Sequence, residues 1–169
     1  QYLADHTSSF VQLCMKAAAG IQMRWIMDKG RFNAATCPRQ AARVKELYEA
    51  GGQMRLFTPR GKRGSWPCMH AKSMIFDNKV VLAGSVNLTH NGLENNTEHL
   101  YRIESEDVVQ EMTTHFEEIW KMSKEMTMQD VDKIVTKVGK NAEKQKVEDG
   151  GGSENPPASG SPSPSDGDA

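Results

Sequence analysis

A predicted β-hairpin between residues 69 and 83 constrains the fold of this chain more than any other feature. Met69 to Phe76 is expected to form the first strand, Asp77-Asn78-Lys79 the turn, and Val80 to Ala83 the returning strand. Before this hairpin, segments with helical periodicity alternate with strand-like segments. This combination predicts an α/β fold, with a mixed β-sheet flanked by helices.

The other elements are predicted from periodicity and from the residues that begin and end them. In chain order we expect a helix at 7–19, a strand at 21–28, a loop through Gly30 to Pro38, a helix at 38–50, strands at 53–59 and 99–104, and a helix capped by Ser105. The last helix has its expected buried face at Val108, Met112, Phe116, Ile119 and Trp120.

Composition divides the chain into three parts. Residues 1–124 are expected to form one folded domain, and residues 125–149 a helical extension with a thin apolar face. Residues 150–169 contain no large apolar side chain, so they cannot offset their ordering entropy and are predicted to be disordered. No signal peptide and no apolar stretch long enough to span a bilayer are present, and the start at Gln1 predicts an N-terminally truncated domain.

Charge is unevenly distributed along the chain. The net charge of -1 over 169 residues predicts no particular partner. Residues 50–76, however, contain no acid, and their cations are Arg55, Arg60, Lys62, Arg63 and Lys72. A local positive field of this kind favours an anionic substrate, although a solvated basic loop has the same composition.

The cysteines give no support for a metal site. Cys14, Cys37 and Cys68 are widely spaced and form no C-x-x-C pair. Reduced thiols in a cytosol-like compartment are therefore expected. No metal and no other cofactor is predicted.

The polar residues of the hairpin predict a site for an anionic ester. Side chains two apart on a strand point the same way, so His70 and Lys72 are expected to share one face, about 7 Å apart. Ser85 and Asn87 follow the returning strand, and Gly84 has no side chain to block a close approach. The four polar side chains can therefore converge on one spot.

The residue types in this set suit a phosphodiester. Lys, Asn and Ser donate hydrogen bonds to phosphate oxygens, and His can attack phosphorus or protonate a leaving oxygen. No cluster of carboxylates accompanies them. The predicted chemistry is metal-independent cleavage through a covalent phosphohistidine.

An in-line reaction of this kind needs a nucleophile on one side of phosphorus and an acid on the other. His70 is the one strong candidate among the histidines, which also include His6. His90 and His99 lie near the motif but have no matching lysine, and His115 falls in a predicted helix. A two-fold homodimer supplies the second group, since two copies of His70 can face each other across the axis.

The motif resembles that of the phospholipase D superfamily. "HAKSMIFD" fits the HxKxxxxD (HKD) pattern, "GSVN" fits its GSxN continuation, and "NNTEH" and "FEEIW" are also similar. The resemblance covers about residues 7–122 and is strongest to single-motif members, the mitochondrial cardiolipin hydrolase (Zucchini-type) proteins and small bacterial endonucleases. It implies a homodimer with one shared active site, and a family strand and helix that precede this chain.

The resemblance also implies a role for each site residue. His70 would be the nucleophile in one copy and the acid in the other, and Lys72, Asn87 and Ser85 would hold the phosphate oxygens. Asp77 would support the site, and Glu98 would orient the histidine. One departure is Leu88, which stands where the family often has an aromatic residue.

The substrate class stays open at this stage. The main expectation is a phospholipid, cardiolipin-like or phosphatidyl. The family resemblance implies a cytosol-facing protein on the mitochondrial outer membrane, held at that surface through the missing N-terminus. The alternatives are an endonuclease that prefers single strands, the C-terminal half of a two-motif phospholipase D, and an inactive fragment. A membrane anchor upstream would favour the lipid, and a long basic groove would favour the nucleic acid.

Overall fold

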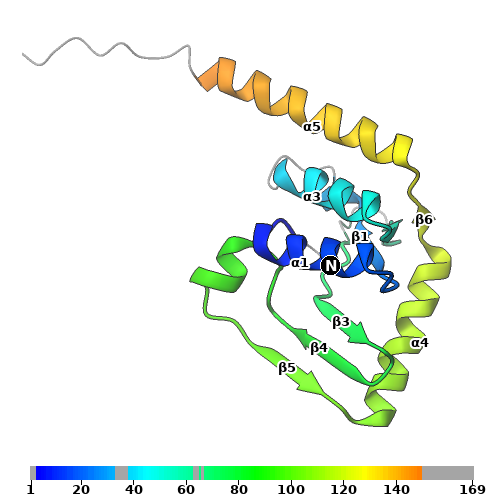
Figure 1. Cartoon of the computed structure of the whole chain (residues 1–169). Helices are drawn as coiled ribbons and strands as arrows, with labels where there is room; N and C mark the ends of the chain where they lie inside the picture. The colour runs from blue at the N-terminus through cyan, green and yellow to red at the C-terminus, as the bar shows by residue number, and fades with distance from the viewer. Residues whose placement is uncertain (1–2, 33–37, 63–64, 66, 150–169) are drawn as a thin grey trace, which may run out of the picture.

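The structure is a computed structural model that describes residues 3–32, 38–62, 65 and 67–149. Its elements are α1 (Thr7–Ala18), β1 (Arg24–Asp28), α2 (Lys29–Phe32), α3 (Pro38–Glu49), β2 (Gln53–Phe57), β3 (Ser73–Phe76), β4 (Val80–Gly84), the π-helical turn η1 (Asn91–Asn95), β5 (Leu100–Ile103), α4 (Glu106–Met122), β6 (Lys124–Glu125) and α5 (Met128–Asp149) (Figure 1). The predicted α/β class is confirmed.

The strands form two three-stranded sheets. In the first, of order β1-β2-β6, β1 and β2 are parallel and β6 is antiparallel, so this sheet is mixed. In the second, of order β3-β4-β5, all pairs are antiparallel. The mixed arrangement follows from the sequence order, because the helix α3 connects two parallel strands and a tight turn connects two antiparallel ones.

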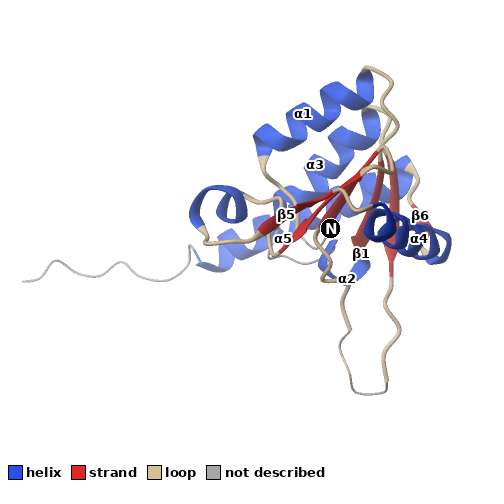
Figure 2. Cartoon of the chain, turned by 90° about the horizontal axis from the view of Figure 1, so that it is seen from below, coloured by secondary structure: helices blue, strands red, loops and turns tan. Residues whose placement is uncertain are grey.

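Helices cover the strands on two sides (Figure 2). Met27 of β1 belongs to the main core, which contains Phe10 of α1 and Val44 of α3. The neighbouring Ile26 points the other way and lines a cavity of about 260 Å³ against α4. Adjacent strand residues face opposite sides of a sheet, so α4 covers the face opposite to α1 and α3.

The predicted helices are found close to their expected positions, with differences at their ends. Ser105 occupies the N-cap position of α4, but its side chain makes no capping hydrogen bond. The buried face of α4 is shifted, because Val109 is buried whereas Val108 is 37% exposed. The loop predicted through Gly30 begins with the short helix α2, and residues 33–37, including Cys37, lie outside the described residues.

The segment after residue 124 packs onto the rest of the protein. Met126 and Val131 are almost completely buried, and Ile134, Val135 and Val138 pack against the same core. Lys45 of α3 also bonds Asp132 of α5, with Nζ 2.7 Å from Oδ1. The division of the chain at residue 124 stays a prediction, and the expected disordered tail at 150–169 lies outside the described residues.

Among the residues that the structure describes, no helix combines the length and apolar character needed to cross a membrane.

Candidate active site

The predicted hairpin is present, but its first strand is shorter than expected. Strand β3 begins at Ser73, so residues 69–72 are not part of it and the prediction of a strand from Met69 is wrong. The Lys72 carbonyl oxygen still accepts the Gly84 N–H at 3.2 Å, a hydrogen bond of the kind that joins adjacent strands. The Met69 N–H donates to the Asp28 side chain and not to the backbone of a neighbouring strand.

His70 and Lys72 nevertheless lie together. Lys72 Nζ is 3.0 Å from Nδ1 and 3.1 Å from Nε2 of the exposed His70 ring, and it donates to the His70 carbonyl oxygen at 2.8 Å. Their neighbours Met69, Ala71, Ser73 and Ile75 line the cavity against α4. This alternation places the histidine and the lysine on the side of the segment away from α4.

Lys72 is a buried cation. The residue is only 8% exposed. Burial lowers the pKa of its ammonium from the ordinary lysine value, and the charges of Glu98 and Cys68 oppose this effect. A buried cation that points at an exposed imidazole can bind an anion that approaches the ring.

Ser85 and Glu98 form a second group beside Lys72. Ser85 Oγ donates to Glu98 Oε2 and accepts the His99 N–H at 3.1 Å, while Asn96 Nδ2 donates to Glu98 Oε1 at 3.1 Å. The hydrogen bond from Ser85 is the largest cause of a lowered pKa at the half-exposed Glu98 carboxyl, and the bond from Asn96 is the next. The charge of Lys72 lowers this pKa further. Glu98 thus supplies a negative charge close to the lysine.

Gly84 allows the backbones of β4 and β5 to approach each other closely. A Cβ at this position would overlap the carbonyl oxygen of His99. Strands β4 and β5 meet here in the register Gly84↔Leu100. The glycine is required because the backbone of the next strand occupies the place of a side chain.

Asn87 lies in the segment that leaves β4. Its Oδ1 is buried and accepts no hydrogen bond from the described residues. The next residue, Leu88, is fixed by the N-terminal segment, because it donates to Leu3 O at 3.2 Å and accepts the Asp5 and His6 N–H groups at 2.9 Å. The backbone around Asn87 is therefore held in place.

Asp77 is not brought to this site. It lies at the turn of the hairpin, where Asp77 and Asn78 have φ of 50° and 53°. The whole of β3 separates it from His70, a path on the order of 20 Å in extended chain. A direct role for Asp77 at the histidine stays a prediction that this geometry does not support.

Sequence reasoning missed one residue that contacts the site segment. Asp28, at the end of β1, accepts the Met69 N–H through Oδ2 at 2.7 Å and is 3% exposed. The available signal was a carboxylate directly after the apolar residues of a strand, where a buried acid needs partners.

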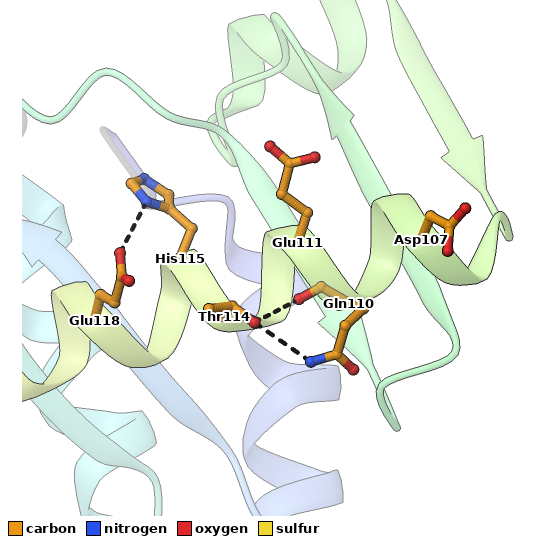
Figure 3. Close-up of a pocket in the computed structure, with 6 residues that line it drawn as sticks. All are labelled: Asp107, Gln110, Glu111, Thr114, His115 and Glu118. Atoms are coloured by element: carbon orange, nitrogen blue, oxygen red, sulfur yellow. Dashed lines mark hydrogen bonds and ion pairs between the residues drawn. The ribbon is translucent and has the colours of Figure 1, made fainter.

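The described residues contain no group of three His, Cys, Asp or Glu side chains arranged to hold a metal ion. A hollow of about 510 Å³ lies over the outward face of α4, where Figure 3 shows Asp107, Glu111, His115 and Glu118 along the helix. None of the predicted site residues lines it.

Known proteins resemble this chain in sequence or in fold. Residues 1–120 match the family described as "Cardiolipin synthase, PLD-like domain". The mitochondrial cardiolipin hydrolase of Canis lupus familiaris is 40% identical over 52 residues, which are 31% of this chain and 20% of that protein, so the match spans about a fifth of the relative's length.

Two solved structures resemble the chain in fold. The phospholipase D family member Nuc from Salmonella typhimurium aligns with a TM-score of 0.63 at 19% identity, over 74% of this chain and 77% of that one. NucT from Helicobacter pylori aligns with a TM-score of 0.65 at 20% identity, over 74% and 78%. With the family match over most of the chain, the conclusion is that this protein belongs to the family of phospholipase D-like (PLD-like) domains.

Proposed function

We propose that this protein hydrolyses a phospholipid phosphodiester, cardiolipin-like or phosphatidyl, through a covalent phosphohistidine on His70. The observation that carries the proposal is the contact of Lys72 Nζ with the His70 ring, at 3.0 Å from Nδ1. An imidazole and a cation that touch each other can bind and attack the same phosphate.

The reaction needs two histidines that act in turn. In the first step a neutral His70 nitrogen forms a bond to phosphorus, and the bond to the leaving oxygen breaks. The His70 of a second copy gives its proton to that oxygen. In the second step the same imidazole takes a proton from water, the hydroxide attacks phosphorus, and the phosphorus–nitrogen bond breaks.

The remaining side chains hold the phosphate in this scheme. The Lys72 ammonium and the Asn87 carboxamide contact the non-bridging oxygens, and Ser85 joins them when its single hydroxyl proton turns from Glu98 Oε2 to the phosphate. Glu98 Oε2 holds the Ser85 hydroxyl, which fixes the position of that oxygen. The proposal includes no metal, because these donors supply the positive charge and hydrogen bonds that the reaction requires.

The lipid is the first choice of substrate because of the 40% identity with a protein named a cardiolipin hydrolase. A nucleic-acid strand is the second candidate, and one feature favours it. The exposed Arg60 and Lys62 lie in the connection between β2 and β3 that also carries His70. A polyanion longer than one phosphate could reach His70 and these two cations together.

Trapping the intermediate tests reaction and substrate together. The protein is incubated briefly with vesicles of phosphorus-labelled cardiolipin or phosphatidylcholine and, in parallel, with labelled single-stranded RNA and DNA, then quenched in alkali, where a phosphoramidate survives. We expect label on the protein from the lipids and none in a His70→Ala variant. Label from oligonucleotides alone would show that the substrate is a nucleic acid and that the protein acts as a nuclease. Absence of label and of product from every substrate would refute it.

A further inference from the structure

A buried carboxylate supports the segment that carries His70. Asp28 is the last residue of β1 and is 3% exposed, although its side chain is one of the most polar in the chain. Burying such a group is costly unless hydrogen bonds compensate it. Its partners therefore indicate what it is needed for.

Both oxygens of Asp28 accept backbone hydrogen bonds. Oδ2 accepts the Met69 N–H at 2.7 Å, and Oδ1 accepts the Arg31 N–H at 2.9 Å. Gly30 leaves room for this arrangement, since a Cβ there would lie 3.1 Å from Oδ1. The carboxylate thus connects the end of β1 with two separate segments.

The bond to Met69 acts where regular structure gives no support. Met69 directly precedes His70, and β3 begins only at Ser73. The Met69 amide is also largely buried, since the residue is 9% exposed, so it cannot rely on water as an acceptor. Asp28 supplies the acceptor that a neighbouring strand would otherwise provide.

We infer that Asp28 is a positioning residue for the proposed reaction: through the Met69 amide it fixes the backbone that presents His70 to the phosphate. The hydrogen bonds of Asp28 go to the backbone amides of Arg31 and Met69, so it acts on His70 through the backbone. The inference rests on the proposed function for its kinetic consequence. Its structural part, the bond to Met69, stands independently.

The isosteric substitution Asp28→Asn changes the hydrogen-bonding capacity of the side chain and keeps its volume. A carboxylate accepts at both oxygens, whereas a carboxamide has one oxygen and one NH₂ group. In the variant one of the two N–H groups, of Met69 or of Arg31, must face a donor. The volume stays the same, so the core around Asp28 is not emptied.

The first measurement uses the unaltered chain. Hydrogen exchange followed by NMR should show the Met69 amide protected well beyond an exposed loop amide. Rapid exchange at Met69 in this protein would overturn the inference without any variant.

The second measurement compares Asp28→Asn with Asp130→Asn. Asp130 also accepts a backbone N–H, that of Thr127 at 3.3 Å, but it lies at the start of α5. In Asp28→Asn we expect kcat to fall by about 10–100-fold with KM changed less than about twofold, and the His70 ring resonances to shift. Asp130→Asn should leave all three unchanged.

The outcomes distinguish this inference from the proposed function. If the unaltered protein cleaves no substrate, the proposed function fails, whereas the Met69 exchange and the His70 ring shift still decide whether Asp28 holds the segment. If the protein is active and folded Asp28→Asn keeps its kcat, Asp28 only stabilises the fold and the inference is overturned.

Discussion

The ammonium of Lys72 lies against the ring of His70, with Nζ 3.0 Å from Nδ1 and 3.1 Å from Nε2. The lysine is buried and the histidine is exposed, so the cation reaches the ring from the protein side. An anion from solvent would meet the ring first and the cation directly behind it.

Replacing Lys72 by Met removes the charge and keeps much of the side-chain volume. We expect turnover to fall by at least about 100-fold, because the phosphate loses its buried cation. The free energy of unfolding should stay equal or rise by about 1 kcal/mol, since a buried charge is replaced by an apolar chain. Steady-state kinetics and urea unfolding check this. A variant that is inactive because it is unfolded would contradict the prediction.

The same lysine should set the alkaline limit of activity. Burial lowers the pKa of Lys72 in the folded protein below its unfolded value. Between these two values the unfolded chain binds more protons, so the stability penalty from this group decreases as pH rises through the folded pKa. Activity should instead decline through that pKa, below the ordinary lysine range. A rate profile against pH, beside unfolding curves of Lys72→Met, measures both effects.

The Ser85 hydroxyl should set the pH at which the Glu98 carboxyl takes up a proton. Its hydrogen bond is the largest cause of the lowered pKa of Glu98, so Ser85→Ala should raise that pKa toward its ordinary value. The folded pKa of Glu98 lies below the unfolded one, so this group stabilises the protein above the unfolded pKa and loses that contribution as pH falls through the folded pKa.

The titration of the Glu98 carboxyl, followed by NMR of its side-chain carbon, should therefore move to higher pH in Ser85→Ala. Asn96→Ala removes the second cause and serves as a graded comparison, with a smaller shift in the same direction. A Glu98 titration that stays in place in both variants would show that these two hydrogen bonds do not lower its pKa.

Local sequence signals predicted most of the fold. Residues that tolerate positive φ predict the turn at Asp77 and Asn78, and both residues have positive φ. An apolar stripe that ends at two glycines predicts helix α3, and Gly51 has a φ of 104°. These features depend on neighbours in sequence, so one sequence was sufficient to predict them.

The features that were missed depend on contacts between distant segments. Met69 is excluded from β3 because Asp28, 41 residues away in sequence, takes its amide. Val109 rather than Val108 is buried because the strands determine which side of α4 faces inward. The pairing of His70 with Lys72 was predicted from a strand that does not extend to them, and only the alternation of side chains was right.

Gly84 and Gly139 form a matched pair for a stability test. A Cβ at Gly84 would overlap the His99 carbonyl, whereas a Cβ at Gly139 in α5 meets nothing within 4 Å. We expect Gly84→Ala to cost about 3 kcal/mol of unfolding free energy. Gly139→Ala should gain up to about 1 kcal/mol from helix propensity. Denaturant midpoints measure both, and equal midpoints would contradict the close contact between β4 and β5.

The proposed active site, shared between two copies, predicts how mixtures of two chains behave. If both steps require His70 from each of two copies, a dimer of one unaltered and one His70→Ala chain is inactive. After full exchange of an equal mixture, about one quarter of the dimers contain two unaltered chains, and activity should fall to about one quarter of that of an all-unaltered sample at the same total concentration. Independent sites would instead keep one half.

The His70→Ala chain is suited to this experiment because the exposed ring contributes little to the core, so the variant should fold and exchange normally. Mixing the unaltered chain with Gly139→Ala provides the control, because that substitution lies in α5 and should leave activity at its full value. Mass spectrometry of differently tagged chains confirms that mixed dimers have formed. Activity that follows the fraction of unaltered chains in proportion, with mixed dimers present, would show that a single His70 is enough, and the second proton donor would then have to come from this chain itself.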